Sequence, residues 1–188
     1  MKIRNSSVYL IIFLFFIVGY GQGSEYLDGE IVTRSGDTLI VKIKVLDRFQ
    51  SFRKINYMTA SGAKKKMLAE DIRMYKRGKE EYETLILAYG VYVLAKKLIH
   101  GPYLNLYVVE SKESLNQRIL NEALGKKMPM VRQHKYLKLK TGQVINATMS
   151  GKSKIKKFLN GFPLVVEKIE KGKIKSVEKI IVECNNIR

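Results

Sequence analysis

The part of the chain between Glu25 and Glu110 alternates short apolar segments with turns that contain glycine. In Asp37–Asp47 (DTLIVKIKVLD), every second residue from Leu39 to Val45 is aliphatic, so an extended strand there carries one apolar face. Turns such as Ser61-Gly62 follow at intervals of roughly ten residues. Antiparallel folds are built from short strands at this spacing. The pattern predicts a β domain over residues 22–110, arranged as an antiparallel sandwich or an open barrel.

The expected strands of this domain share β-branched or aromatic residues bounded by turn residues. They are residues 29–33, 37–47, 52–59, 64–68, 72–76, 81–87, 91–99 and 103–110. Segment 91–99 (VYVLAKKLI) differs from the others, because its residues fit either a strand or a helix. Both assignments stay open for this segment.

The pattern changes after Glu110. Residues 111–133 combine a short helical spacing with an exposed loop, which is typical of a linker or an inserted element. Residues 134–188 contain a basic hairpin, with strands at 136–140 and 143–147, and then three short amphipathic helices. Ser176 is expected to cap the last helix. The predicted fold class is therefore α+β: the antiparallel sandwich or open barrel is followed by a β hairpin and three C-terminal helices.

Residues 1–21 have the composition of a secretory signal peptide. Two basic residues and no acid precede the apolar run 8–18 (VYLIIFLFFIV), and small residues follow it. The run is about 11 residues, whereas a membrane-spanning helix needs roughly 20. Cleavage is expected after Gly21 or after Gly23. The sequence predicts an exported protein that is periplasmic, outer-membrane-associated or extracellular.

The charge of the chain is high and unevenly distributed. The formal net charge is +18, and residues 126–188 alone contain 16 Lys and Arg against 4 Asp and Glu. For an exported protein this asymmetry suggests an anionic partner, namely lipid head groups, lipopolysaccharide, an acidic glycan or an acidic protein, ahead of nucleic acid. A solvated lysine surface that keeps the protein soluble is the alternative. The candidate contacts are Lys152, Lys154, Lys156, Lys157, Lys168, Lys171, Lys173 and Lys175.

The stretch Asn146–Leu159 (NATMSGKSKIKKFL) contains a GKS like the end of a phosphate-binding loop. Such a loop needs a glycine about five residues before the glycine of the GKS, and this chain has Asn146 there. The preceding strand is also short and polar, and no apolar run ends in an Asp suited to Mg²⁺. These departures argue against a nucleotide site. Ser150 or Ser153 is expected to cap a helix instead.

Other residues that could carry chemistry are few. His100 and His134 lie on different segments without the spacing of metal ligands, so we expect a turn residue and a strand-edge residue. Cys184, the only cysteine, lies on the apolar face of the last expected helix, which favours a buried thiol over a nucleophile. No catalytic residue, metal site or cofactor is predicted.

Five tyrosines lie close together in the sequence of the β domain: Tyr82, Tyr89, Tyr92, Tyr103 and Tyr107. Amphipathic rings suit interfaces and sugar-binding faces. Cross-strand packing within a sheet is the other use of such rings, and it is favoured here. Basic residues with interleaved aromatics also suit single-stranded nucleic acid, a partner that export makes less available.

Several segments share their pattern with known proteins. They are GEIVTRSGDTLIVKI at 29–43, an Asp-Ile before an aromatic at 71–75, GPYLNLY at 101–107, KKFL at 156–159 and KIIVECN at 179–185. The combination resembles a group of exported proteins common in Bacteroidota, in which Tyr usually stands at the position of Cys184. The resemblance implies an envelope protein with a β-rich N-terminal part and a lysine-rich helical C-terminal part, and it implies no activity.

Together these features predict a non-enzymatic protein of the cell envelope that binds an anionic envelope component or a partner protein. Three alternatives stay open. They are an undetected hydrolase that uses His100 or His134, a binding module for nucleic acid or another anionic ligand, and a structural subunit of an envelope assembly.

Overall fold

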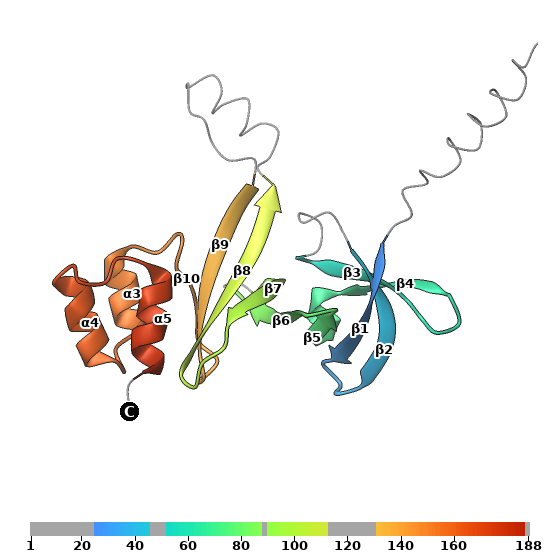
Figure 1. Ribbon diagram of the computed structural model, residues 1–188, viewed down its shortest axis with the longest axis horizontal. Helices are drawn as coiled ribbons and strands as arrows, with labels where there is room; N and C mark the ends of the chain where they lie inside the picture. The colour runs from blue at the N-terminus through green and yellow to red at the C-terminus, as the bar shows by residue number, and fades with distance from the viewer. Residues whose placement is uncertain (1–24, 46–51, 88–89, 113–130, 187–188) are drawn as a thin grey trace, which may run out of the picture.

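The computed structural model describes residues 25–45, 52–87, 90–112 and 131–186. In these residues ten strands form one sheet, and three α-helices follow it (Figure 1). The strands are β1 (Tyr26–Thr33), β2 (Thr38–Lys44), β3 (Lys54–Met58), β4 (Lys64–Leu68), β5 (Ile72–Arg77), β6 (Glu80–Ile86), β7 (Tyr92–Ile99), β8 (Leu104–Lys112), β9 (Val131–Leu139) and β10 (Val144–Asn146). The helices are the 3₁₀ turn η1 (Ala69–Asp71), α3 (Lys152–Phe158), α4 (Pro163–Glu170) and α5 (Val177–Asn185).

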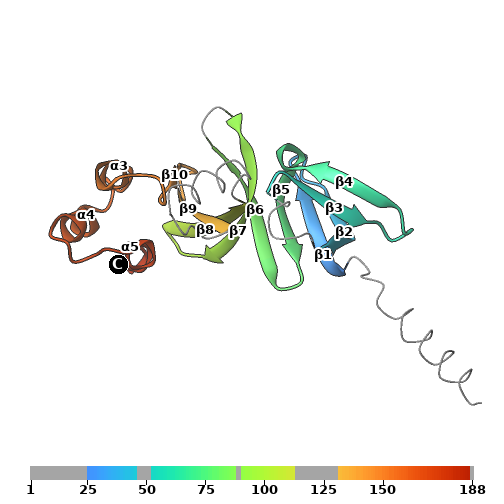
Figure 2. The same cartoon turned by 90° about the horizontal axis from the view of Figure 1, so that it is seen from above.

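The strands of the sheet are antiparallel, in the order β10-β9-β8-β7-β6-β5-β1-β2-β3-β4. Consecutive strands are therefore neighbours except where β5 returns to pair with β1. The two views show an elongated molecule, with β1–β4 at one end and the three α-helices at the other (Figures 1 and 2).

The predicted α+β class is confirmed, because an open antiparallel sheet precedes three C-terminal helices. Segment 91–99, left open between strand and helix, is the strand β7. The predicted hairpin corresponds to β9 and β10, and β9 pairs with β8 along its length, so the hairpin extends the same sheet. The predicted signal peptide, residues 1–21, lies outside the described residues, and so does most of the predicted linker, 113–130.

The N-terminal half of the sheet curls around its own apolar face. The backbone N–H of Leu94 in β7 donates to the carbonyl of Phe52, just before β3, at 2.7 Å. Thr84 Oγ1 in β6 donates to the carbonyl of Ala69 in η1 at 3.2 Å. The curl encloses one apolar cluster, whose buried residues are Ile31, Val41, Ile43, Ile55, Tyr57, Ala69, Ile72, Tyr75, Tyr82 and Leu94.

Gly29 in β1 allows the strands of this curl to approach closely. A Cβ atom at this position would lie 2.4 Å from the carbonyl oxygen of Lys76 and 2.7 Å from Cδ1 of Ile43. Real Cβ atoms are not found at such distances, so any side chain here would push β1 away from β5.

Residues 147–186, which comprise α3, α4, α5 and the loops between them, form what we call the helical lobe. The lobe packs on one end of β8 and β9, where the spacing of its apolar residues places them on the inner side of each helix. The buried residues of this second cluster are Leu104, Leu106, Leu137, Ala147, Leu159, Val165, Ile169, Ile174, Ile180, Ile181 and Cys184.

Asn185 at the end of α5 fixes the helical lobe to the turn between β7 and β8. Its Oδ1 accepts from the backbone N–H groups of Tyr103 and Leu104 at 3.1 and 3.0 Å, and its Nδ2 donates to the Leu104 carbonyl at 2.9 Å. Gly101 makes room for this amide, because a Cβ atom there would lie 2.0 Å from Nδ2. One side chain thus joins segments about 80 residues apart in the sequence.

The predicted caps have different outcomes. Ser176 caps α5, as predicted, by accepting from the backbone N–H of Lys179 at 3.3 Å. The prediction that Ser150 or Ser153 caps α3 is wrong, because Gly151 occupies the N-cap and no side chain caps that helix. Asn146 Oδ1 instead accepts from the N–H groups of Thr148 and Met149, each at 3.0 Å, and this turn brings Gly151 to the cap.

Candidate functional site

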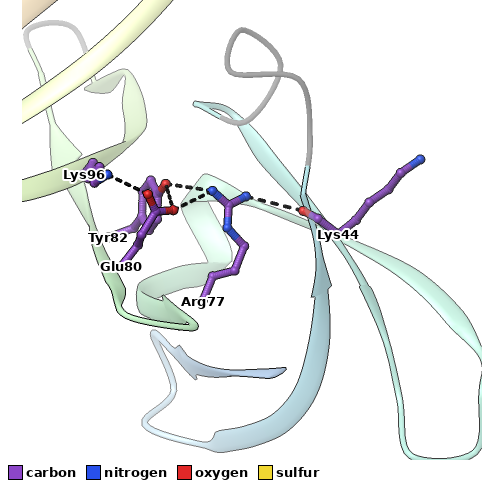
Figure 3. Close-up of polar contacts among 5 residues, drawn as sticks. All are labelled: Lys44, Arg77, Glu80, Tyr82 and Lys96. Carbon is purple, nitrogen blue, oxygen red and sulfur yellow. Dashed lines mark hydrogen bonds and ion pairs between the residues drawn. The ribbon is translucent and has the colours of Figure 1, made fainter. Parts of the chain in front are cut away.

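Charged side chains gather at two places on the protein: a cavity lined by strands of the curled sheet and by β8, and the surface of the helical lobe. The cavity has a volume of about 490 Å³. Four of its lining residues form a polar cluster (Figure 3): Arg77 at the end of β5, Glu80 and Tyr82 on β6, and Lys96 on β7. The register brings them together, because Arg77 pairs with Glu80, and Tyr82 pairs with Lys96.

Hydrogen bonds connect all four side chains. Arg77 Nη2 donates to Glu80 Oε2 at 2.8 Å and to the Tyr82 hydroxyl at 2.9 Å, and that hydroxyl donates to Glu80 Oε2 at 2.8 Å. Lys96 Nζ donates to Glu80 Oε1 at 2.6 Å. Arg77 Nη1 also lies 3.5 Å from the Lys44 carbonyl oxygen, which connects β5 with the end of β2 (Figure 3). Arg77 is 9% exposed, so the cluster satisfies a buried guanidinium.

The surroundings of the cluster shift the pKa values of its members. Burial on its own raises the pKa of Glu80, but hydrogen bonds from Lys96, Arg77 and Tyr82 outweigh it and lower this pKa to about 2. Burial raises the pKa of Tyr82 well above its ordinary value of 10.0. The same effect raises the pKa of Tyr75, whose ring stacks on Tyr82 with centroids 4.4 Å apart. At neutral pH Glu80 is therefore ionised, and the hydroxyl of Tyr82 is neutral.

The charges around the cavity do not favour an anion. Beside Arg77 and Lys96, the lining contains three carboxylates, Glu25, Glu80 and Glu110. Glu80 forms ion pairs with both cations. With Glu25 and Glu110 added, the lining carries three negative charges against two positive charges. The cavity is therefore a poor match for the anionic partner that the sequence predicts.

The structure places all eight predicted lysines on the helical lobe. Lys152, Lys154 and Lys157 are exposed on α3, and Lys173 and Lys175 are exposed on the loop between α4 and α5. The other three form ion pairs. Lys156 pairs with Glu170 and Lys168 with Glu183, each at 2.6 Å, and Lys171 pairs with Glu167.

These pairs, with the pair of Lys135 and Glu178 at 2.6 Å, take up all four glutamate side chains of residues 126–188, which contain no aspartate. Among the described residues, the five exposed lysines on α3 and on the loop have no ion-pair partner. Lys179 on α5 is likewise exposed and has no ion-pair partner among the described residues, so the unpaired positive charge of the lobe lies on α3, on the loop between α4 and α5, and on α5. Lys168, Lys171 and Lys173 line one shallow groove together, whereas the α3 lysines line no part of it.

The remaining residues singled out from the sequence do not assemble into a reactive site within the described part of the chain. His100 follows β7 in a turn and His134 lies within β9, so the two belong to different elements. Cys184 is fully buried, and burial raises the pKa of its thiol to about 12. Among the described residues, no three His, Cys, Asp or Glu side chains are placed to hold a metal ion.

Comparison with known proteins adds no further information about the site. No protein-family model matches the chain, and neither the curated proteins nor the solved structures contain one with significant similarity. None of the helices in the described ranges is long and apolar enough to cross a membrane.

Sequence reasoning did not identify the polar cluster around Arg77. Its only local signal is the order Arg77, Gly78, Glu80, Tyr82, in which Gly78 adopts a φ of 55° and closes a tight hairpin between β5 and β6. That hairpin predicts that Arg77 and Glu80 face each other. The contribution of Lys96 depends on the pairing of β6 with β7, which the local sequence does not specify.

Proposed function

We propose that the protein is exported to the cell envelope, where the helical lobe binds an anionic envelope component without catalysing a reaction. One observation carries the proposal: the carboxylate side chains of the lobe are taken up by ion pairs, and six exposed lysines of the lobe have no partner among the described residues. A lysine surface that served solubility alone would be expected to mix both signs of charge. The signal-peptide pattern of residues 1–21 supports export.

The proposal is tested with the mature chain, which lacks residues 1–21, and vesicles of neutral lipid with or without anionic lipid. Lipopolysaccharide micelles form a second arm that distinguishes a lipid head group from a glycolipid. Binding to either anionic surface is expected to weaken steeply between about 50 and 200 mM salt, because mobile ions screen charges that lie at the surface. Binding that ignores salt would contradict a charge-driven contact.

Charge reversal locates the surface. The variant Lys152→Glu, Lys154→Glu, Lys157→Glu changes three exposed lysines of α3. Each lysine near an anionic surface contributes about 1 kcal/mol, so the three reversals are expected to weaken binding by about a hundredfold or more.

The matched control reverses three exposed lysines in β4, at the other end of the molecule: Lys64→Glu, Lys65→Glu, Lys66→Glu. Both variants change the net charge equally. The control is expected to bind within about threefold of the unchanged protein, the residual effect being long-range charge. Equal losses in the two variants would show that net charge alone governs binding, and would refute a site on the helical lobe.

A further inference from the structure

A groove of about 480 Å³ lies at the junction between the sheet and the helical lobe. Three separate segments form it: the turn before β8, the end of β9 with its turn to β10, and the end of α3 with its loop to α4. Its lining combines three aromatic rings with polar side chains that are not acidic. The residues that matter here are Tyr103, Phe158, Phe162, Lys140, Gln143 and Asn160.

Backbone hydrogen bonds and one ring-edge contact fix the position of Tyr103 and leave the polar side chains of the groove unused. The backbone carbonyl of Tyr103 accepts from the backbone N–H of Lys140 at 3.0 Å. The backbone N–H of Tyr103 donates to Asn185 Oδ1 at 3.1 Å. The Tyr103 ring meets the Phe162 ring edge to face, with centroids 6.2 Å apart and an angle of 68° between the planes. Pro163 begins α4 directly after Phe162 and fixes the chain there.

The side chains of the groove are available to a ligand. Tyr103 is 44% exposed, which is unusual among the described tyrosines of the sheet, since Tyr75, Tyr82 and Tyr107 are all buried. The structure shows no hydrogen-bond partner, among the described residues, for the side chains of Lys140, Gln143 or Asn160. The groove thus offers apolar ring faces beside unused amide and ammonium groups.

This combination fits a sugar better than it fits a lipid chain or a simple anion. The C–H face of a sugar ring packs on aromatic side chains, while its hydroxyls require hydrogen-bond donors and acceptors such as amides. A lipid chain would leave the amides unsatisfied when it covered them. A simple anion would make no use of the rings. Lys140, together with the absence of any carboxylate from the lining, favours a sugar that carries negative charge.

We infer that this groove binds a sugar unit of an acidic glycan, with Tyr103 as the stacking surface and Lys140 as the contact to the sugar's carboxylate or phosphate. The inference rests on the proposed function, because it names the ligand class and adds a specific contact to the lysine surface of the same lobe. Phe158 connects the groove with the lysine surface, because it lines the groove and lies in the same helix as Lys152, Lys154 and Lys157.

The test uses tetragalacturonate, an oligosaccharide with one carboxylate per sugar, and its methyl ester, which has the same rings without the charge. Binding to the mature chain is measured by titration calorimetry, since the protein has no Trp to serve as a fluorescent reporter. Tetragalacturonate is expected to bind more tightly than its ester. Tyr103→Ala and Asn160→Ala, both at exposed residues, are each expected to weaken binding about fivefold to tenfold.

The outcomes separate this inference from the proposed function. If the α3 triple variant no longer binds tetragalacturonate while Tyr103→Ala and Asn160→Ala bind it with full affinity, the α3 lysines bind the anion and the groove is not a sugar site. Equal affinity for the acid and the ester would overturn the role of Lys140. If the mature chain binds anionic vesicles but not tetragalacturonate, the groove inference fails while the proposed function stands. Thermal unfolding of each variant confirms that a loss of affinity comes from a folded protein.

Discussion

At the scale of single residues, the buried guanidinium of Arg77 explains why three other polar side chains gather around it in the cavity of the curled sheet. A buried charge is costly unless it is paired and hydrogen-bonded. Glu80 supplies the charge, Tyr82 supplies a second acceptor, and Lys96 holds the other oxygen of Glu80. Because the contact from Arg77 to the Lys44 carbonyl reaches β2, the cluster also stabilises the curl.

Replacing Glu80 should therefore destabilise the protein in a way that depends on pH. Glu80→Gln is expected to lower the free energy of unfolding by about 1–2 kcal/mol at pH 7, because it removes the carboxylate but leaves Arg77 buried. The folded-state pKa of Glu80 is about 2, below its ordinary value of 4.5. The contribution of the carboxylate is thus complete above about pH 5 and is lost as the pH falls from 4.5 toward 2.

Urea unfolding of the unchanged protein and of Glu80→Gln between pH 7 and pH 2.5 measures this effect. The difference between the two free energies of unfolding should shrink as the pH falls. Glu70→Gln, at an exposed carboxylate in η1, is the matched control and should change stability by less than about 0.5 kcal/mol at pH 7. A difference for Glu80→Gln that stays constant with pH would contradict the paired state of this carboxylate.

At the scale of secondary-structure elements, much of the fold could be predicted from local sequence. Alternation of apolar residues identified the strands, and Ser176 identified the start of α5, because these signals act over a few residues. The return of β5 to pair with β1 has no local signal, since it depends on which apolar faces can be buried together. Gly151 at the N-cap of α3 was missed because the nearby serines suit a cap equally well by composition.

The two candidate sites also differ in how far they could be predicted from the sequence. The charge of the helical lobe could be predicted, because it is visible in composition, and the exposure of Lys152, Lys154 and Lys157 follows from the helical spacing of the apolar residues in α3. The groove beside Tyr103 could not be predicted, since its rings and amides come from three segments, two turns and the end of α3 with its following loop, that meet only in the folded chain. Five tyrosines were indistinguishable in the sequence, and burial alone separates Tyr103 from Tyr82 and Tyr107.

The attachment of α5 to the turn before β8 gives a prediction at this scale. Asn185→Ala removes three hydrogen bonds to the backbone of Tyr103 and Leu104 and should lower the free energy of unfolding by about 2–3 kcal/mol. Asn185→Asp keeps the acceptor and loses the donor, so its effect should be smaller. Urea unfolding measures both, with Asn186→Ala at the exposed neighbouring residue as the control, expected within about 0.5 kcal/mol. Equal effects at 185 and 186 would show that the amide does not hold the lobe.

At the scale of the whole molecule, three apolar clusters share strands rather than residues. A middle cluster, made of Leu85, Val93, Ala95, Tyr107, Val109 and Tyr136, lies between the cluster of the curled sheet and that of the helical lobe. Its residues lie on β6 and β7, which also contribute residues to the cluster of the curled sheet, and on β8 and β9, which also contribute residues to the cluster of the helical lobe. Glu83 reinforces this continuity, because it bonds the Tyr107 hydroxyl on β8 and pairs with Lys138 on β9.

Shared strands should make the two ends of the molecule unfold together, although no residue belongs to both end clusters. Ile31 and Ile181, one in each of these clusters, are both fully buried, so replacing either by Ala is expected to cost about 2–5 kcal/mol. Native-state hydrogen exchange then shows which amides have a lower opening free energy in each variant. If the strands couple the ends, Ile181→Ala lowers the opening free energy of the β1–β2 amides as much as that of the β8–β9 amides. Ile31→Ala then lowers the opening free energy of the β8–β9 amides as much as that of the β1–β2 amides. If Ile181→Ala affects only β8 and β9, the helical lobe unfolds as a separate unit, and a ligand bound there would not stabilise the curled sheet.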